Sequence, residues 1–310
     1  GLLQVLIGVA MVVCMLAWSS LDWIRIPLWV IERSPSLLRN NAFYKLFACL
    51  AQSAALVFVP TFLMGFAFPF AGRFFASEIK SLGRRLGSAY MINTLGAMLG
   101  PLIWGFWCLP LLGIQNALLL TAAGAALSGA IVLAYVNRKW AVCGAVALCL
   151  IIASLAVLPE KVLAQSYQRR RGKVLHYEED VDGSVAVLQT PQRGGDCRQL
   201  MVGVTSMITD NFRCRRYTRM IGHLPMLMHP EPKNALVICL GSGMTLAGVT
   251  RHASLESVDC ADLSRGVINA ARNWFSEAND HVLDDPRVRL IINDGRTHLL
   301  TTAKRYDVIA

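Results

Sequence analysis

Charged residues are scarce in this chain of 310 residues: they make up 16% of it, whereas a soluble domain carries about 25%. Residues 161–310 hold sixteen of the twenty acids and all six histidines. The first 160 residues contain no histidine and only four acids, which are Asp22, Glu32, Glu78 and Glu160. This distribution excludes a single uniformly soluble domain and indicates a boundary near residue 160.

Metal-ligand and disulfide patterns are also missing. The nine cysteines form no Cys-x-x-Cys pair and no cysteine–histidine spacing of the kind that binds zinc. Cys239 and Cys260 lie in strand-like runs, and we expect them to be small buried hydrophobic residues. The sequence therefore predicts neither a bound metal nor a disulfide framework.

Long apolar runs fill the first half. A helix needs about 20 mostly apolar residues to cross a bilayer. Five runs qualify: 2–18, 47–70, 90–112, 116–136 and 140–158. Because lipid cannot satisfy backbone polar groups, helices are expected here, and residues 1–160 are predicted to be an all-α transmembrane bundle that contacts the lipid bilayer. Gly96 and Gly100 are expected to let helices of this bundle pack closely.

The net charge of +10 does not indicate a nucleic-acid partner, because basic residues beside apolar runs usually set membrane topology. With five spans, the loops on the side of the C-terminal half carry nine basic residues, and the opposite loops carry six. The positive-inside rule therefore predicts that the C-terminal half lies in the cytoplasm. Residues 161–173 are expected to be a basic linker beside the lipid headgroups.

The second half alternates between short strand and helix patterns. Residues 174–208 hold three alternating runs separated by glycine-containing turns, which predicts a small antiparallel β unit. A helix follows and is ended by Pro230 and Pro232, so this unit and its helix span 174–230. Residues 231–310 read β-α-β-α-β-α-β, the pattern of a Rossmann-like α/β domain with a parallel sheet and helices on both faces. The chain starts without methionine and stops within a strand pattern, so we expect a fragment.

Three features converge at the carboxyl ends of the predicted strands, where ligands of such a fold bind. A glycine turn follows the first strand, Asp262 ends the second, and an Asp-Gly pair ends the third. A carboxylate at 262 can accept both ribose hydroxyls, and one at the third strand can receive an adenine amino group. The residues of this predicted nucleoside site are Gly241, Ser242, Gly243, Asp262, Asp294 and Gly295.

The glycine turn argues against a dinucleotide. Position 246 is leucine, so the fingerprint G-x-G-x-x-G is incomplete. This disfavours NAD and favours ligands of the S-adenosylmethionine type, which have no pyrophosphate.

Several segments, in order, resemble the spermidine synthase (polyamine aminopropyltransferase) family: "HLPMLMHPEPKNALVICLGSG", "VDCADLSRGVINAAR" and "DDPRVRLIINDGR…YDVI". The first half, with "PTFLMGFAFPFAGRFF", is similar to the multi-pass, major-facilitator-like region fused to such domains in some bacterial proteins. The resemblance implies transfer of an aminopropyl group from decarboxylated S-adenosylmethionine to a polyamine acceptor, without a metal, by an inner-membrane, multi-pass protein. The family's catalytic aspartate would follow the "YDVI" strand, beyond Ala310, so the catalytic residue is unknown here, and Asp307 is expected to be structural.

Two positions depart from the family pattern. Ser242 stands where the family's glycine turn carries an aspartate that faces the amine end of the donor. The family's Tyr-His-Glu triplet reads Tyr217, Thr218 and Arg219, and an arginine facing a diamine would repel it. Tyr217 and His223 match the family in position and are the candidate acceptor-side residues.

Alternatives therefore stay open. Loss of the donor-side carboxylate favours a methyltransferase-like enzyme that uses ordinary S-adenosylmethionine. A transporter with a non-catalytic nucleoside-binding domain and an inactive binding domain are the others. Whether the chain forms a homo-oligomer is also left open.

Overall fold

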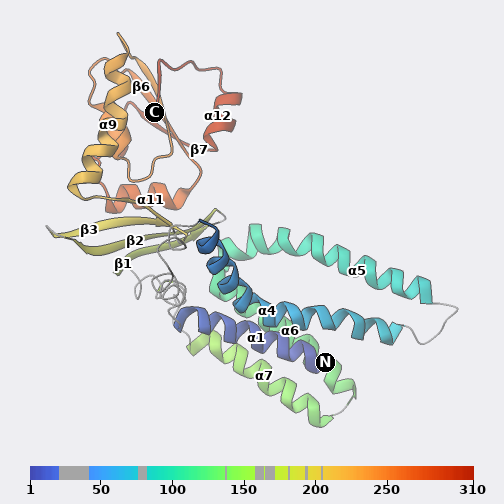
Figure 1. Cartoon of the computed structure of the whole chain (residues 1–310). Helices are drawn as coiled ribbons and strands as arrows, with labels where there is room; N and C mark the ends of the chain where they lie inside the picture. Colours follow the sequence, from blue (N-terminus) through green and yellow to red (C-terminus); the bar gives the residue numbers. More distant parts are fainter. Residues whose placement is uncertain are drawn as a thin grey trace. The chain divides into compact units, whose positions relative to one another are not determined.

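The computed structural model describes residues 1–20, 42–75, 82–136, 138–157, 164, 172–180, 182–192, 195–203 and 205–310 (Figure 1). It divides into two compact units, Gly1–Ser166 and Tyr167–Ala310, which we call the helical unit and the mixed unit. The basic residues on which the predicted topology depends lie largely outside the described residues.

The helical unit is built from apolar helices. α6 packs against α1 and α7, and α1 also packs against α4. The elements are α1 (Leu2–Ser20), α4 (Ala42–Phe75), α5 (Leu82–Ile103), the π-helical turn η2 (Trp104–Cys108), α6 (Leu109–Val136) and α7 (Arg138–Val157).

Glycines bring α1 and α6 together. A Cβ atom added to Gly8 would lie 2.5 Å from the carbonyl oxygen of Ala122, and one added to Gly129 would lie 2.8 Å from the backbone nitrogen of Val5. Side chains at these positions would push the helices apart. Close approach of small residues is therefore what holds this helix pair.

The close packing predicted at Gly96 and Gly100 is wrong. Among the described residues, no atom lies within 4 Å of a Cβ atom added to either glycine. The spacing of small residues does not say which face of a helix meets a neighbour, and here Gly96 is exposed and Gly100 is half-buried.

The predicted third and fourth spans form one helical run. Gly113 bends this run with φ 76° and ψ 166°, and the π-helical turn follows Pro101, which lacks the N–H that an α-helix needs at that point. In the part of the chain that the structure describes, Gly83–Val136 is the one helix long and apolar enough to cross a membrane. Shorter apolar helices are Leu2–Ala17, Val57–Ala67 and Val142–Ser154. A five-span bundle is not shown by these observations.

The mixed unit begins with an antiparallel sheet of order β1-β2-β3-β4, which confirms the predicted small β unit. The fourth strand was not predicted, because Gly203, with φ 55°, turns the chain inside what read as one run. Val187 and Leu200 of this sheet pack with Val267 and Phe275. The strands are β1 (Lys173–Asp180), β2 (Gly183–Gln192), β3 (Gly195–Val202) and β4 (Thr205–Thr209).

Helix α9 (Phe212–Met228) follows β4. It begins earlier than its apolar pattern, because Asn211 caps it by accepting a hydrogen bond from the N–H of Cys214 at 2.9 Å. It ends at His229, whose extended backbone is what a residue before proline prefers. The predicted end before Pro230 is confirmed.

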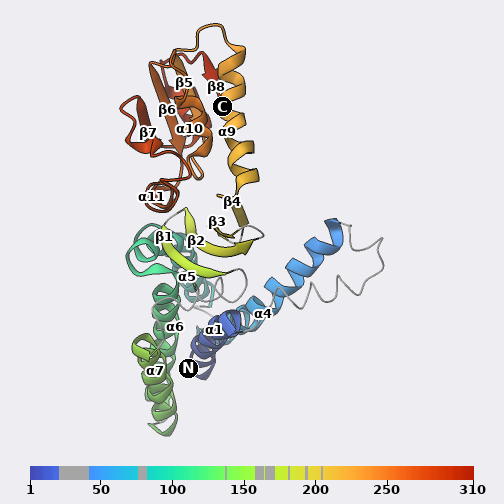
Figure 2. The same ribbon diagram turned by 90° about the vertical axis from the view of Figure 1, so that its left-hand side faces the viewer.

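A parallel sheet of order β7-β6-β5-β8 completes the mixed unit and confirms the predicted Rossmann-like α/β domain (Figure 2). Val237, Val258 and Cys260 are buried in its core with Leu246 and Val249 of α10. α9 and α12 flank the sheet on opposite sides (Figure 1). The elements are β5 (Asn234–Ile238), α10 (Met244–Thr250), β6 (Ser257–Asp262), α11 (Arg265–Trp274), the 3₁₀ turn η3 (Val282–Asp284), β7 (Val288–Ile292), α12 (Gly295–Thr301) and β8 (Val308–Ile309).

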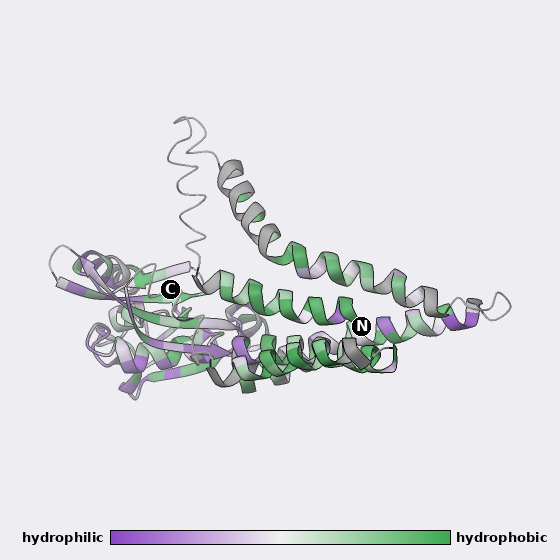
Figure 3. Ribbon diagram, turned by 90° about the horizontal axis from the view of Figure 1, so that it is seen from below, coloured by the Kyte–Doolittle hydropathy of each residue, from purple (hydrophilic) through white to green (hydrophobic). Residues whose placement is uncertain are grey.

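Hydrophobic residues predominate along the described helices of the helical unit, and hydrophilic residues are frequent in the mixed unit (Figure 3). The mixed unit nevertheless buries two acids of β6, Asp259 and Asp262, of which Asp259 is 2% exposed. Lys304 donates to Oδ1 of Asp259 at 3.1 Å, and Tyr306 donates to its Oδ2 at 2.7 Å. Burial and the bond to this carboxylate raise the pKa of Tyr306 to about 12. The buried charge is thus compensated by the chain that leads into β8.

Two glycines let α9 and α10 cross at backbone contact. A Cβ atom on Gly222 would lie 2.2 Å from the carbonyl oxygen of Thr245, and one on Gly248 would lie 2.4 Å from that of Arg219. Neither obstacle is a flexible side chain. The helices must therefore separate to accept even a methyl group.

Gly222→Ala is expected to lower the free energy of unfolding of the mixed unit by about 1–3 kcal/mol, the usual cost of overpacking. Denaturant-dependent hydrogen exchange of its peptides measures this. Ile221→Ala, on the exposed side of the same helix, is the control and should change stability by less than about 0.5 kcal/mol. Equal effects of the two variants would contradict the close crossing.

The residue after β5 corrects the expectation for the cysteines. Cys260 is buried as predicted, but Cys239 is exposed and has φ 71°. This left-handed conformation costs a residue with a Cβ atom about 1–2 kcal/mol. A strained residue therefore follows β5 directly and is separated from the glycine turn by Leu240.

Cys239→Gly is expected to raise the free energy of unfolding by about 1 kcal/mol, because glycine adopts positive φ without strain. Cys239→Ser keeps the Cβ atom and should leave stability nearly unchanged. Urea unfolding of the two variants beside the parent chain decides this. A glycine variant no more stable than the serine variant would disprove strain at this position.

Candidate functional site

The glycine turn lies at the carboxyl end of β5. The strand order reverses at this point, because β6 and β7 lie on one side of β5 and β8 lies on the other. Gly241 and Gly243 have φ 55° and 82°, which only glycine adopts freely. The N–H of Gly243 donates to the carbonyl oxygen of Leu240 at 2.9 Å and closes the turn. The backbone can therefore approach a ligand here, at the point where α/β folds of this kind bind theirs.

Asp262 ties the end of β6 to this turn. Its Oδ2 accepts the N–H of Leu240 at 2.7 Å, and its Oδ1 accepts the N–H of Ser264 at 2.9 Å. Ser264 caps α11, since its side chain accepts from the N–H of Val267. Each carboxylate oxygen of Asp262 can accept one more hydrogen bond. The residue is therefore a structural link that still has acceptor capacity.

Asp294 and Gly295 begin α12 beside the same strand end. Asp294 caps the helix through the N–H of Thr297 at 2.8 Å, and this bond holds the pKa of its exposed carboxyl below the ordinary value. A Cβ atom on Gly295 would lie 2.5 Å from Cγ2 of Ile238. The absence of a side chain at 295 thus lets the start of α12 reach the end of β5.

Backbone contacts join the ends of the neighbouring strands. The N–H of Asn293, which precedes Asp294, donates to the carbonyl oxygen of Asp262 at 3.1 Å. The structure therefore brings all three predicted features to one edge of the sheet. Partial desolvation raises the pKa of the exposed Cys239 thiol, and the negative charges of Asp262 and Asp294 raise it further. Cys239 lies beside this candidate site and was not predicted to do so.

Ser242 lies in the middle of the turn and is only 4% exposed. Its carbonyl oxygen accepts a hydrogen bond at 2.9 Å from the side chain of Asn279. Asn279 was also missed, because a lone amide in a loop carries no sequence signal.

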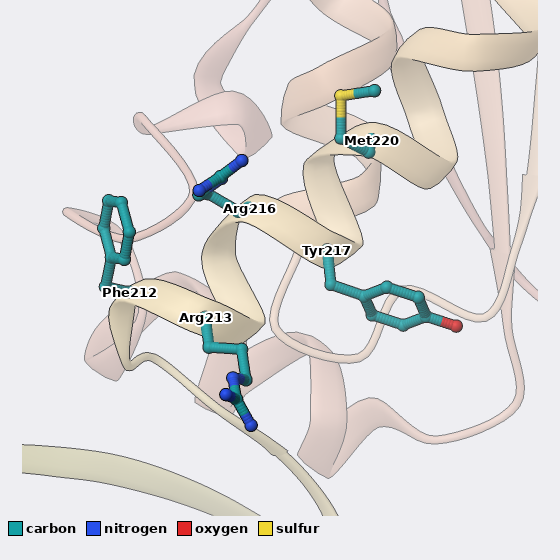
Figure 4. Close-up of a pocket in the computed structure, with 5 residues that line it drawn as sticks. All are labelled: Phe212, Arg213, Arg216, Tyr217 and Met220. Carbon is teal, nitrogen blue, oxygen red and sulfur yellow. The ribbon is translucent and has the colours of Figure 1, made fainter.

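The candidate acceptor-side residues lie on α9. Tyr217 is 67% exposed in a depression of about 370 Å³ (Figure 4). His223 is half-buried, and its Nδ1 lies 3.0 Å from Nε2 of His252, which follows α10. The residues that line the depression with Tyr217 are Phe212, Arg213, Arg216 and Met220.

Arg219 corrects the expectation of an arginine that faces the acceptor. Its Nη2 donates to Oδ1 of Asp280 at 2.8 Å and to the carbonyl oxygen of Ala278 at 3.0 Å. Its charge is therefore compensated by an acid that the sequence analysis did not connect with it. Repulsion of a diamine by Arg219 is not supported.

Asp307 is structural, as predicted. Its Oδ2 accepts the N–H groups of Lys233 and Asn234 at 2.9 and 2.8 Å, at the start of β5. Within the described ranges, no three or more histidines, cysteines or acids are grouped so that they could hold a metal ion.

Comparison with known proteins concerns the C-terminal region. Residues 214–310 match the spermine/spermidine synthase domain. A polyamine aminopropyltransferase of Methanocaldococcus jannaschii is 40% identical over 93 residues, 30% of this chain and 31% of that protein. One from Shigella boydii is 37% identical over 93 residues, 30% of this chain and 32% of that protein. The crystal structure of spermidine synthase from Thermotoga maritima matches with a TM-score of 0.40 and 28% identity, over 44% of this chain and 47% of that chain.

The chain spans about a third of the length of the curated relatives it matches. The matched segment contains the glycine turn, Asp262, the Asp294–Gly295 pair and both candidate acceptor-side residues. These matches support the predicted family for this segment and do not extend to the helical unit. Residues 214–310 are thus related to the spermine/spermidine synthase domain.

Proposed function

We propose that this chain is part of a membrane-anchored, spermidine synthase-like transferase, which moves an aminopropyl group from decarboxylated S-adenosylmethionine to an amine. One observation carries the proposal. The glycine turn, Asp262 and Asp294 meet at the carboxyl edge of the parallel sheet, within the segment that matches the spermine/spermidine synthase domain. None of the three features alone would name a reaction.

The donor would be held by groups already oriented by the fold. Asp262 has acceptor capacity left on both oxygens for two ribose hydroxyls, and its backbone hydrogen bonds fix its rotamer. Asp294 uses Oδ1 as a helix cap and leaves Oδ2 for an adenine amino group. A Cβ atom at Gly241 would meet no described atom within 4 Å, so this glycine leaves space for the sulfonium end to pass.

The reaction needs a lone pair on the acceptor amine. That nitrogen attacks the methylene carbon bonded to sulfur, and the carbon–sulfur bond breaks toward the sulfur. The sulfonium becomes a neutral thioether, so the positive charge passes to the nitrogen and leaves it with the proton. No residue of this chain is assigned as the base that takes it.

The α9 surface bears on which amine is accepted. Arg213 and Arg216 flank Tyr217, and neither forms an ion pair with the described residues. The helix contains no acid. A depression of this charge does not attract a polycation, so the acceptor would have to be held by groups other than α9.

A methyltransferase-like use of ordinary S-adenosylmethionine is the second candidate. The observation in its favour is Ser242, which is neutral and buried in the glycine turn. An acid at this position would disfavour the carboxylate of S-adenosylmethionine, whereas a serine would not. A transporter with a non-catalytic nucleoside-binding domain is the third candidate. Binding of the two donors separates the first two.

The helical unit would supply the membrane anchor, in the inner membrane and with the mixed unit in the cytoplasm. The proposed anchor is supported by the exposed apolar side chains on all sides of α5, such as Ile92, which is 67% exposed, and Met98, which is 64% exposed. A helix that is apolar all round is stable only when it is covered by protein or lipid. Lipid is the covering that we propose.

Decarboxylated S-adenosylmethionine is expected to bind the full chain more tightly than S-adenosylmethionine, as measured by calorimetric titration. Asp262→Ala should weaken this binding by about 1–3 kcal/mol, the cost of a charge-assisted hydrogen bond. Tighter binding of S-adenosylmethionine would favour the methyltransferase-like candidate.

Asp307→Ala is the matched control for Asp262→Ala. It also removes a carboxylate that accepts backbone N–H groups of the β5 region, but at the opposite end of the strand. Both variants should lower stability, and only Asp262→Ala should change the dissociation constant. Parallel changes in both would mean that Asp262 acts through the fold alone.

The full chain is expected to stay in the membrane pellet after washing at alkaline pH. Ile92→Asp should reduce the retained fraction, because an acid in the middle of a membrane helix costs about 2.5–3.5 kcal/mol. Ile92→Val is the control. Complete release of the parent chain into the supernatant would refute the anchor.

A further inference from the structure

The segment after α11 touches both the glycine turn and α9. Asn279 lies within it and is 1% exposed. The next two residues, Asp280 and His281, have φ 57° and 55°, which residues with a Cβ atom rarely adopt. Such strain persists only where surrounding contacts impose it.

Asn279 supports the glycine turn through its side-chain amide. Its Nδ2 donates to the carbonyl oxygen of Ser242 at 2.9 Å and to that of Ala271 at 3.1 Å. Because both partners are carbonyl acceptors, the amide nitrogen must face them. The side chain thus joins the end of α11 to the middle of the glycine turn.

Gly243 is shaped to receive this amide. A Cβ atom at 243 would lie 2.9 Å from Nδ2 and 3.2 Å from Cβ of Asn279. The second glycine of the turn is therefore needed for its positive φ and for contact with Asn279. The closed turn and the contact with the Asn279 amide both depend on the absence of a Cβ atom at position 243.

Arg219 holds the chain on both sides of Asn279. Its Nη2 binds the carbonyl oxygen of Ala278 and Oδ1 of Asp280. Arg251, which follows α10, binds Oδ2 of Asp280 at 2.7 Å. Burial opposes ionisation of Asp280, but the bond from Arg251 and the charge of Arg219 together hold its pKa below the ordinary value. The acid is therefore ionised at neutral pH and bridges two helices.

We propose that Asn279 is a positioning residue that sets the conformation of the glycine turn, and that Arg219 and Asp280 hold Asn279 in place. The identity of the ligand rests on the proposed function, whereas the support that Asn279 gives the turn does not. Arg219 thereby couples α9, which bears Tyr217 and His223, to the donor end of the site. Arg219, which the family pattern places on the acceptor side, therefore acts on the donor side.

Asn279→Ala in the full chain tests this with two measurements. Without ligand, hydrogen exchange of the peptide spanning 240–247 should speed up about tenfold, because the turn loses its support. The dissociation constant for decarboxylated S-adenosylmethionine should rise about tenfold under conditions where the variant is fully folded. Val282→Ala is the control, since Val282 is a buried core residue three positions away. It should lower the unfolding midpoint but leave both readouts within about twofold.

Arg219 provides the second variant, which also serves if Asn279→Ala does not fold. Arg219→Gln should speed exchange of the same peptide, and Arg219→Lys should restore part of the protection. Combined with Asn279→Ala, the Arg219→Gln effect should be less than additive, because both act through one contact. Full additivity would overturn the role given to Arg219.

The outcomes separate this inference from the proposed function. If hydrogen exchange of the 240–247 peptide in Asn279→Ala matches that in the Val282→Ala control, the inference is overturned, whichever donor the chain binds. Faster exchange in a chain whose parent form binds neither donor supports the hold on the turn and refutes the proposed function. Faster exchange with an unchanged dissociation constant overturns the role of Asn279 in ligand positioning.

Discussion

The candidate site depends on the carboxylate of Asp262, which joins two backbone segments that no side-chain packing could align so closely. It accepts one N–H from the residue before the glycine turn and one from the cap of α11. Each bond is charge-assisted and shielded from water, so each is stronger than a neutral bond at the surface. The turn, the start of α11 and the end of β6 are therefore fixed relative to one another before any ligand arrives.

The sequence was sufficient for the features that repeat. Alternation of strand and helix patterns predicted the parallel sheet, and glycine and acid positions at strand ends predicted which loops would meet. These follow from the rule that carboxyl ends of parallel strands share an edge. The start of α9 and the turn at Gly203 were less predictable, because each depends on one residue.

The sequence was insufficient for contacts between residues that lie far apart in the chain. Arg219 and Asp280 are separated by 61 positions, and Asn279 and Ser242 by 37. No periodicity links such pairs. Gly96 and Gly100 show the converse: their spacing is informative about packing only if a neighbouring helix is present on that face. Motif spacing therefore predicted local geometry well and tertiary partners poorly.

The two carboxylates at the ends of β5 have a consequence for the central strand. Asp307 accepts from the residues that begin it, and Asp262 accepts from Leu240 just beyond its end. If β5 slid by two residues it would keep its inward and outward faces, so hydrophobic alternation alone would not prevent the shift. Such a slide would remove the backbone donors from both acids at once. The pair therefore acts as a two-point register lock, which sets where the strand stops and hence where the glycine turn begins.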